Sequence, residues 1–436
     1  MHKDRRRKRD TVPTSVHNRE TAEETGSSDR AIDRVPPYRL TLPRFNGTVE
    51  GAELLLLAPL TSVHIGRAAR EYLSSNLLRF ILPSLGEEAS YVTHVPCRLG
   101  HEVALDHAVQ CVVAAFHALH SQSSSKQKTL SLYMRALNSL QQAINDPERS
   151  LSAETLCATE LLCLFEYLTN DIDKAWLQHT RGAALLIEHR GPEMFTTEFE
   201  MSLLIGQMGI ITTESYFDSK HCFLEQDAWM STLQSAISPN SQFSDRSERV
   251  ISLYESLIEL TGLFSDCITI VMNPDEHDGV LYETLVRKVY TRREALSTWY
   301  HRWSKNIPNE MEDKTSSPMT DGPYLWPQIL VTYQACVLMT NRMLVALDRT
   351  LGYLLEPESL EIAGQILTIR SSRQTDIRAG SMMASLSVAH SILDTAEDWH
   401  RDIVDVDLSA KRAYGKPVLI SPEKFRHWVG LMGVNI

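Results

Sequence analysis

Apolar residues recur three and four positions apart along most of this 436-residue chain, which is the spacing of amphipathic helices. One such stripe steps by four, three and four through residues 130–145: Tyr133, Leu137, Leu140 and Ile144. It ends before Pro147, because a proline disfavours helical geometry at the preceding Asp146. We find no sustained alternation of period two and no Asn-Gly or Asp-Gly turn between apolar runs. The pattern therefore predicts an all-α fold of amphipathic helices joined by polar loops.

Further helices are expected downstream. Ser152 stands where an N-cap belongs, and a wide apolar stripe follows it to residue 168. The same spacing predicts helices near 250–271, 281–304, 328–349 and 380–400. Two polar, turn-rich segments between them, 238–249 and 306–322, are expected to be surface loops.

The composition indicates how large a core the chain can form and in which compartment it is expected. With 43% hydrophobic residues the chain can form one large core or two fused cores. Its longest uninterrupted apolar run, 54–60, is far shorter than the ~20 residues that cross a bilayer, and no secretory leader opens the chain. We therefore expect a soluble, intracellular protein without a membrane partner. Residues 1–48 are expected to be a disordered basic arm and linker, and 49–436 a helical domain.

Positive charge is concentrated in "KDRRRKR" at residues 3–9, whereas the remaining 37 Lys/Arg and 54 Asp/Glu give the rest of the chain a net charge of −17. Such an acidic body repels nucleic acid, whose binding depends on phosphate neutralisation. Any nucleic-acid affinity must then reside in the arm, in Lys3, Arg5, Arg6, Arg7, Lys8 and Arg9. A run of this kind is a nuclear-import signal, a phosphate-contact segment or an uncommitted terminus.

The sequence offers little support for metal, cofactor or catalytic chemistry. Seven scattered cysteines are expected to be free, buried thiols in a reducing compartment. In residues 101–120 only His107 and Cys111 share a helix face, while His117 and His120 point away, so we expect no metal site. Neither phosphate-binding glycine pattern occurs, nor does G-x-S-x-G. No cofactor is expected.

Residues 174–190 form a predicted helix with a signal at each end. Acidic residues precede it, and His189 and Arg190 end it where a cation is favoured. Gly191 suits a left-handed C-cap, and Pro192 prevents continuation. The helix has one face of mixed character and two small residues beside it, which would allow another helix to approach closely: Trp176, His179, Thr180, Ala183 and Ile187, with Gly182 and Ala184. The favoured interpretation is a packed central helix; the alternative is that His179 or Arg181 lines a ligand site.

Residues 133–195 resemble the core of the fungal-specific transcription factor domain, the helical regulatory region of fungal zinc-cluster activators. The residues that carry the resemblance are Tyr133, Ala136, Leu137, Leu140, Leu156, Leu161, Trp176, His179, Gly182, Ala183, Arg190, Gly191 and Pro192. A later segment, "CFLEQDAW" at 222–229, is similar to a downstream element of the family. The resemblance implies a nuclear protein that regulates transcription, with a helical domain from about residue 50 to the C-terminus.

Family members commonly carry an N-terminal zinc cluster, held by six cysteines, that reads DNA. This chain departs from that pattern, because its first cysteine is Cys97 and no C-x-x-C pair occurs. Only "KDRRRKR" resembles the basic segment that follows the cluster in the family. DNA contact is therefore expected through the arm, through a partner or through a zinc cluster encoded upstream.

Three functions are weighed. The resemblance favours a nuclear regulator of a metabolic gene set, such as a secondary-metabolite pathway, which works with the transcription machinery. An adaptor without a DNA role, forming a homodimer or a heterodimer with a zinc-cluster regulator, is the alternative. An enzyme using His179 with Glu188 or Asp173 is disfavoured, because no nucleophile, base and orienting group occur together. An effector pocket between helices is plausible for the family, although the sequence assigns no residue to it.

Overall fold

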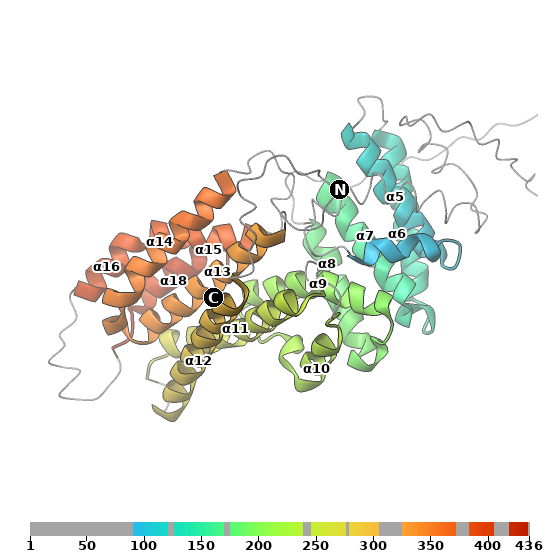
Figure 1. Ribbon diagram of the computed structural model, residues 1–436. Coiled ribbons are helices and arrows are strands. Elements are labelled where there is room, and N and C mark those ends of the chain that lie inside the picture. The colour runs from blue at the N-terminus through green and yellow to red at the C-terminus, as the bar shows by residue number, and fades with distance from the viewer. Residues whose placement is uncertain are drawn as a thin grey trace, which may run out of the picture. The chain divides into compact units, whose positions relative to one another are not determined.

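The computed structural model describes residues 90–120, 126–169, 175–238, 246–275, 279–304, 325–371, 383–404 and 418–434. Every regular element in these ranges is helical, as Figure 1 shows. The predicted all-α fold is thus confirmed. The basic arm, the linker and the loop 306–322 lie outside the described residues, so the boundary at residues 48 and 49 stays a prediction.

The first group of helices carries the family-like segment. Its elements are η2 (Ser90–Cys97), α5 (Val103–His120), α6 (Lys126–Ile144), η3 (Arg149–Leu151), α7 (Ala153–Thr169), α8 (Ala175–Arg190), η4 (Pro192–Met194), α9 (Glu198–Phe217), η5 (Phe223–Glu225) and α10 (Asp227–Ser235). Helix α5 packs on α6 and α7, α7 packs on α8, and α8 packs on α9. The predicted N-cap of α7 is confirmed, since Ser152 Oγ accepts a hydrogen bond from the Thr155 amide at 3.1 Å. Their inward faces form one hydrophobic core.

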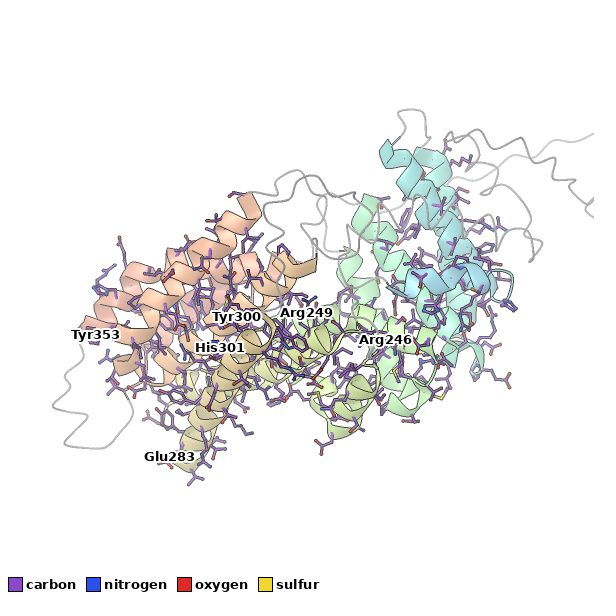
Figure 2. All side chains as sticks on the ribbon, in the orientation of Figure 1. Arg246, Arg249, Glu283, Tyr300, His301 and Tyr353 are labelled. Carbon is purple, nitrogen blue, oxygen red and sulfur yellow. The ribbon has the colours of Figure 1, made fainter. Side chains whose placement is uncertain are left out.

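A second core involves the remaining helices. These are α11 (Glu248–Met272), α12 (Gly279–Trp303), α13 (Leu325–Leu347), η7 (Arg349–Leu351), α14 (Gly352–Ser371), α15 (Met383–Asp394), α16 (Ala396–Val404) and α18 (Pro422–Leu431). Helix α11 belongs to both cores: Ile251 and Ile258 pack in the first, whereas Phe264 and Val271 pack in the second. At its start, the Trp299 indole of α12 donates to the Arg249 carbonyl at 3.0 Å. Figure 2 labels Arg249 and Tyr300 on these two helices.

Helix α13 is the most apolar long helix of the second core. Its segment Ile329–Leu347 is the one described helix that is long and apolar enough to cross a membrane, yet 83% of that window is buried inside the protein. It packs against α11, α12, α14 and α15. A helix that is hydrophobic all round and covered by neighbours is a core helix, so we assign α13 to the protein interior.

Arg342 places a charge inside this apolar helix. Its guanidinium lies 3.0 Å from Glu356 of α14, donates to Thr395 Oγ1 at 2.9 Å, and is 4.0 Å from the Trp399 ring centre. Burial lowers the pKa of Arg342 to about 10, although Glu356 opposes that shift. The Arg342 side chain thus links three segments of the second core. The spacing of apolar residues did not predict this buried charge.

Two sequence predictions need correction. The single helix expected at 380–400 is two helices, α15 and α16, which meet at Thr395. The loop expected to extend to residue 249 ends earlier, because Ser247 Oγ accepts from the Val250 amide at 3.3 Å and caps α11 from Glu248 onward.

Candidate functional site at the end of helix α8

The family-like segment ends at a buried arginine. The side chain of Arg190 is 1% exposed, and its guanidinium donates to the carbonyl oxygens of Leu151 and Met194 and to Glu200 Oε1, the last at 3.1 Å. It also lies 5.2 Å from the centre of the Phe195 ring. Burial lowers the pKa of Arg190, and the charge of Glu200 counteracts this. One side chain therefore ties η3, the turn after α8 and the start of α9 together; we call these contacts the Arg190 cluster.

Gly191 turns the chain away from α8 directly after this arginine. It has a φ of 78°, in the left-handed region that favours glycine, and its amide lies within hydrogen-bond distance of the Ile187 and Glu188 carbonyls. A Cβ at this position would lie 2.6 Å from Glu193 Oε1. Pro192 then opens η4. The predicted helix end at Gly191 and Pro192 is confirmed.

Glu200 has two roles at the start of α9. Its carboxylate accepts from the Thr197 amide at 2.9 Å while Thr197 Oγ1 accepts from the Glu200 amide, which is a capping box. Burial raises the pKa of Glu200, but hydrogen bonds from Thr196 and Thr197 and the charge of Arg190 together bring it below its ordinary value. The partner of Arg190 is thus held ionised by the cap of the next helix.

The downstream family-like segment packs onto the same region. The Trp229 ring of α10 lies 5.8 Å from the Phe195 ring and 5.2 Å from the Phe223 ring, measured between centres. Within this segment Glu225 accepts from the Cys222 amide at 2.8 Å and from Thr261 Oγ1 at 3.1 Å. The two segments that resemble the family are therefore neighbours in space, although residues 196–221 separate them in sequence.

Helix α8 supports the packed interpretation. Thr180, Ala183 and Ile187 are fully buried. Arg181 is half exposed and pairs with Glu214 at 2.7 Å and Asp218 at 3.2 Å, so its guanidinium serves contacts within the protein. The side chains of Trp176 and His179, and Asp173, lie outside the described residues. A role for His179 at a ligand site therefore remains a prediction.

The prediction that small residues of α8 face a neighbour holds for Ala184, which packs against the first core, and not for Gly182. Gly182 was expected to let another helix approach closely, but a Cβ built there would meet no described atom within 4 Å. Ala183, one position along the helix, is the small residue that is fully buried. The predicted place of Ala183 on the packed face is confirmed.

A buried acid lies in the same group of helices and was missed from the sequence. Glu160 of α7 is 1% exposed, and the side chain of Gln207 of α9 partly offsets the effect of burial on its pKa. Burial raises the pKa of Glu160 well above its ordinary value and so favours the neutral carboxylic acid. The one signal in the sequence was an acidic residue inside the otherwise apolar stretch "ATELLCLF".

His107 and Cys111 lie four residues apart on helix α5. His107 Nδ1 lies 3.0 Å from Ser139 Oγ, and burial, with Arg135, lowers the pKa of the imidazole. Cys111 is buried, which raises its pKa. In the described ranges no group of three His, Cys, Asp or Glu side chains is placed to hold a metal.

The cysteine prediction holds for six residues and fails for one. None of the seven thiols is in a disulfide, and six are buried, but Cys97, at the end of η2, is exposed. Burial raises the pKa of Cys222 to about 11 and that of Cys336 to about 12, so these thiols stay protonated.

The predicted import or phosphate-contact residues, Lys3, Arg5, Arg6, Arg7, Lys8 and Arg9, lie outside the described residues. Their role stays a prediction. What the described structure does show is that the family-like residues mainly build a core: Ala136, Leu140, Leu156, Leu161, Ala183 and Arg190 are buried.

Comparison with known proteins agrees with this structure. The family model described as "Fungal specific transcription factor domain" matches residues 58–389, about three quarters of the chain. Neither curated proteins nor solved structures give a match to the chain. The matched family is a transcription factor domain and not an enzyme family, and it includes both segments that meet at the Arg190 cluster. The chain therefore belongs to the fungal-specific transcription factor domain family and is a regulator of transcription.

Proposed function

We propose that this protein acts in the nucleus on a defined set of metabolic genes, such as a secondary-metabolite pathway. The observation that supports the proposal is the family match over residues 58–389, together with the Arg190 cluster built from the residues that carry the resemblance. Most of the described residues that carry the resemblance pack in the core. In this proposal the domain therefore acts by binding other molecules through its surface. The proposed binding partner is the transcription machinery.

The basic arm is proposed to deliver the protein to the nucleus and to contact phosphate there. Its six basic residues stand apart from a body with a net charge of −17. Basic clusters of this length serve both import and phosphate binding. DNA contact is then made by the arm, by a zinc-cluster partner or by a zinc cluster encoded upstream.

The test is localisation with a C-terminal fluorescent tag. We expect nuclear signal for the natural chain and loss of that signal when Arg5, Arg6, Arg7 and Lys8 are all changed to Gln. The matched control changes four exposed basic residues of the helical domain to Gln: Lys128, Arg135, Arg287 and Lys288. Cytosolic signal under every condition would refute the proposal. Comparison of transcripts with and without the gene then identifies the regulated set.

An adaptor that dimerises with or sequesters a full-length relative is the second candidate. The specific observation in its favour is that six of the seven cysteines are buried inside the helical domain, where none can serve a zinc cluster. Measuring the native mass distinguishes the two. A mass above that of the 436-residue chain favours an upstream cluster, whereas a matching mass together with a co-purifying relative favours the adaptor.

A further inference from the structure

The imidazole of His221 lies between two carboxylates that come from different elements. Its Nδ1 is 3.0 Å from Glu225 Oε2 of η5, and its Nε2 is 3.1 Å from Asp266 Oδ1 of α11. An ionised carboxylate only accepts hydrogen bonds, so both ring nitrogens have to donate. A neutral imidazole has one N–H, whereas the charged imidazolium has two. The geometry therefore suits the charged ring. We call His221, Glu225 and Asp266 the His221 clasp.

The clasp attaches the segment after α9 to helix α11. Glu225 also accepts from the Cys222 amide at 2.8 Å and from Thr261 Oγ1 of α11 at 3.1 Å. A Cβ at Gly262 would lie 2.6 Å from His221 Nδ1, so the ring lies directly on the surface of α11. Because α11 contributes to both hydrophobic cores, the clasp attaches this segment to the helix that the two cores share.

The turn that leads into the clasp contains a strained residue. Ser219 has a φ of 52°, in the left-handed region that is uncommon for residues with a side chain. Two contacts hold this turn: the Lys220 amide donates to the Ser215 carbonyl at 2.9 Å, and Ser265 Oγ of α11 donates to the Ser219 carbonyl at 2.8 Å. A strained backbone conformation persists only when surrounding contacts hold it. Loss of a hydrogen bond two residues further on, at the clasp, would therefore favour opening of the turn.

The charged side chains around the turn pair with one another. Lys220 lies 3.0 Å from Asp218, and Arg181 of α8 lies 3.2 Å from Asp218 and 2.7 Å from Glu214 of α9. These ion pairs leave Glu225 and Asp266 as the carboxylates that bond the ring.

The same two carboxylates decide when the ring is charged. The hydrogen bond with Glu225 is the largest cause that raises the pKa of His221; burial opposes it, and Asp266 adds to it. The neighbouring thiol adds no charge near neutral pH, because burial, with the charges of Glu225 and Glu188, raises the pKa of Cys222 to about 11. The charge of the clasp thus changes through His221.

We propose that the His221 clasp is a pH-sensitive device that holds residues 218–225 on α11 while the imidazole is charged and releases them when the ring loses its proton. The neutral ring keeps one N–H, so it bonds one carboxylate while its bare nitrogen faces the lone pairs of the other. Since the folded pKa is raised, the clasp is closed below about pH 6.5 and opens as the pH rises through the folded value. The inference goes beyond the proposed function, and it holds whether or not the chain acts in the nucleus.

Hydrogen exchange of the full chain, followed by mass spectrometry, tests the opening. After correction for the intrinsic pH dependence of exchange, we expect peptides that contain residues 218–225 to exchange about threefold faster at about pH 8 than at about pH 6, a modest change because the ion pairs are partly exposed. His221→Gln, which does not titrate, should exchange at equal corrected rates at both pH values. His427→Gln, at an exposed position of α18, is the matched control and should keep the threefold change. Equal corrected rates in the natural chain, or a pH effect that persists in His221→Gln, would overturn the proposal.

Nuclear magnetic resonance of chains labelled with nitrogen-15 at histidine tests the charge of the ring. The His221 signals are assigned by their loss in His221→Gln. We expect a titration midpoint above about 6.5, and a lower midpoint in Asp266→Asn, because that variant replaces one of the two carboxylates. A midpoint at or below about 6.5, or one that Asp266→Asn leaves unchanged, would refute the clasp.

Discussion

At the scale of single residues, Arg190 explains why the resemblance ends where it does. Its guanidinium donates hydrogen bonds to two carbonyl oxygens and one carboxylate, which come from three segments. The next residue, Gly191, has the left-handed backbone conformation that turns η4 back towards Arg190. A lysine has one donor centre and cannot reproduce a planar guanidinium in this geometry. In the Arg-Gly-Pro sequence, Arg190 therefore holds the three segments together, and Gly191 and Pro192 form the turn beside it.

Arg190→Ala is expected to lower the free energy of unfolding by about 3 kcal/mol, because it leaves Glu200 and two carbonyls without their buried donor. The midpoint of urea unfolding, followed by circular dichroism, measures the loss. Arg181→Ala is the control: Arg181 also pairs with two carboxylates, but it is half exposed, so its removal should cost about 1 kcal/mol or less. Equal losses for the two variants would contradict the importance of the buried cluster.

At the scale of elements, helix α11 contains a glycine that local propensity argues against. Gly262 lies in the middle of a 25-residue helix, where alanine is favoured by about 1 kcal/mol. A Cβ there would collide with Glu225 and would lie 2.6 Å from His221 Nδ1. His221 bonds Glu225 at 3.0 Å and Asp266 at 3.1 Å, so these side chains join the segment after α9 to α11. A methyl group at residue 262 would therefore require the Glu225 and His221 side chains to shift.

Gly262→Ala is therefore expected to lower the melting temperature despite its better helix propensity. Gly364→Ala, in α14, is the matched comparison, because a Cβ there meets nothing within 4 Å. It should stabilise the protein by roughly 0.5–1 kcal/mol. Thermal unfolding of both variants checks the pair, and a rise in melting temperature for Gly262→Ala would refute the packing argument.

The elements differ in how far the sequence predicted them. Ser152, Gly191 and Pro192 act on backbone within a few residues, so the helix ends that they set were predictable. The predicted 380–400 helix divides at Thr395, and no proline or glycine lies near that position. The Thr395 hydroxyl accepts a hydrogen bond from Arg342 of α13. Contacts between segments that are distant in sequence do not appear in the spacing of apolar residues, so they could not be predicted from it. Examples are the contacts of Arg190, those of Arg342, and the contact between Glu160 and Gln207. The family resemblance located the Arg190 cluster without explaining it.

At the scale of the whole molecule, stability depends on pH through groups that act in both directions. Glu160 and His221 have raised pKa values, as do Asp106, Glu255 and Glu356, whereas burial lowers the pKa of His94 and His107. The folded pKa of Glu160 is raised by burial, so above about pH 4.5 the unfolded chain releases a proton that the folded chain keeps. His221 has its pKa raised chiefly by Glu225, so its contribution is present below about pH 6.5 and is lost as the pH rises through the folded value. Glu102 and Glu200 have lowered pKa values and lose their contribution only in more acidic solution.

As the pH rises above about 5, the Glu160 contribution and then the His221 contribution to stability should therefore decline, while His94 and His107 act in the opposite direction below about pH 6.5. The two lowered carboxyls are ionised in both states over this range and add no slope. Glu160 alone can contribute up to about 1.4 kcal/mol for each pH unit while its protonation differs between the states. Glu160→Gln removes that term and keeps the shape of the neutral acid, so its unfolding free energy should fall less steeply over this range. Glu193→Gln, at an exposed position, should follow the natural chain. Parallel curves for Glu160→Gln and the natural chain would mean that the Glu160 carboxyl ionises in the folded protein as readily as in the unfolded one.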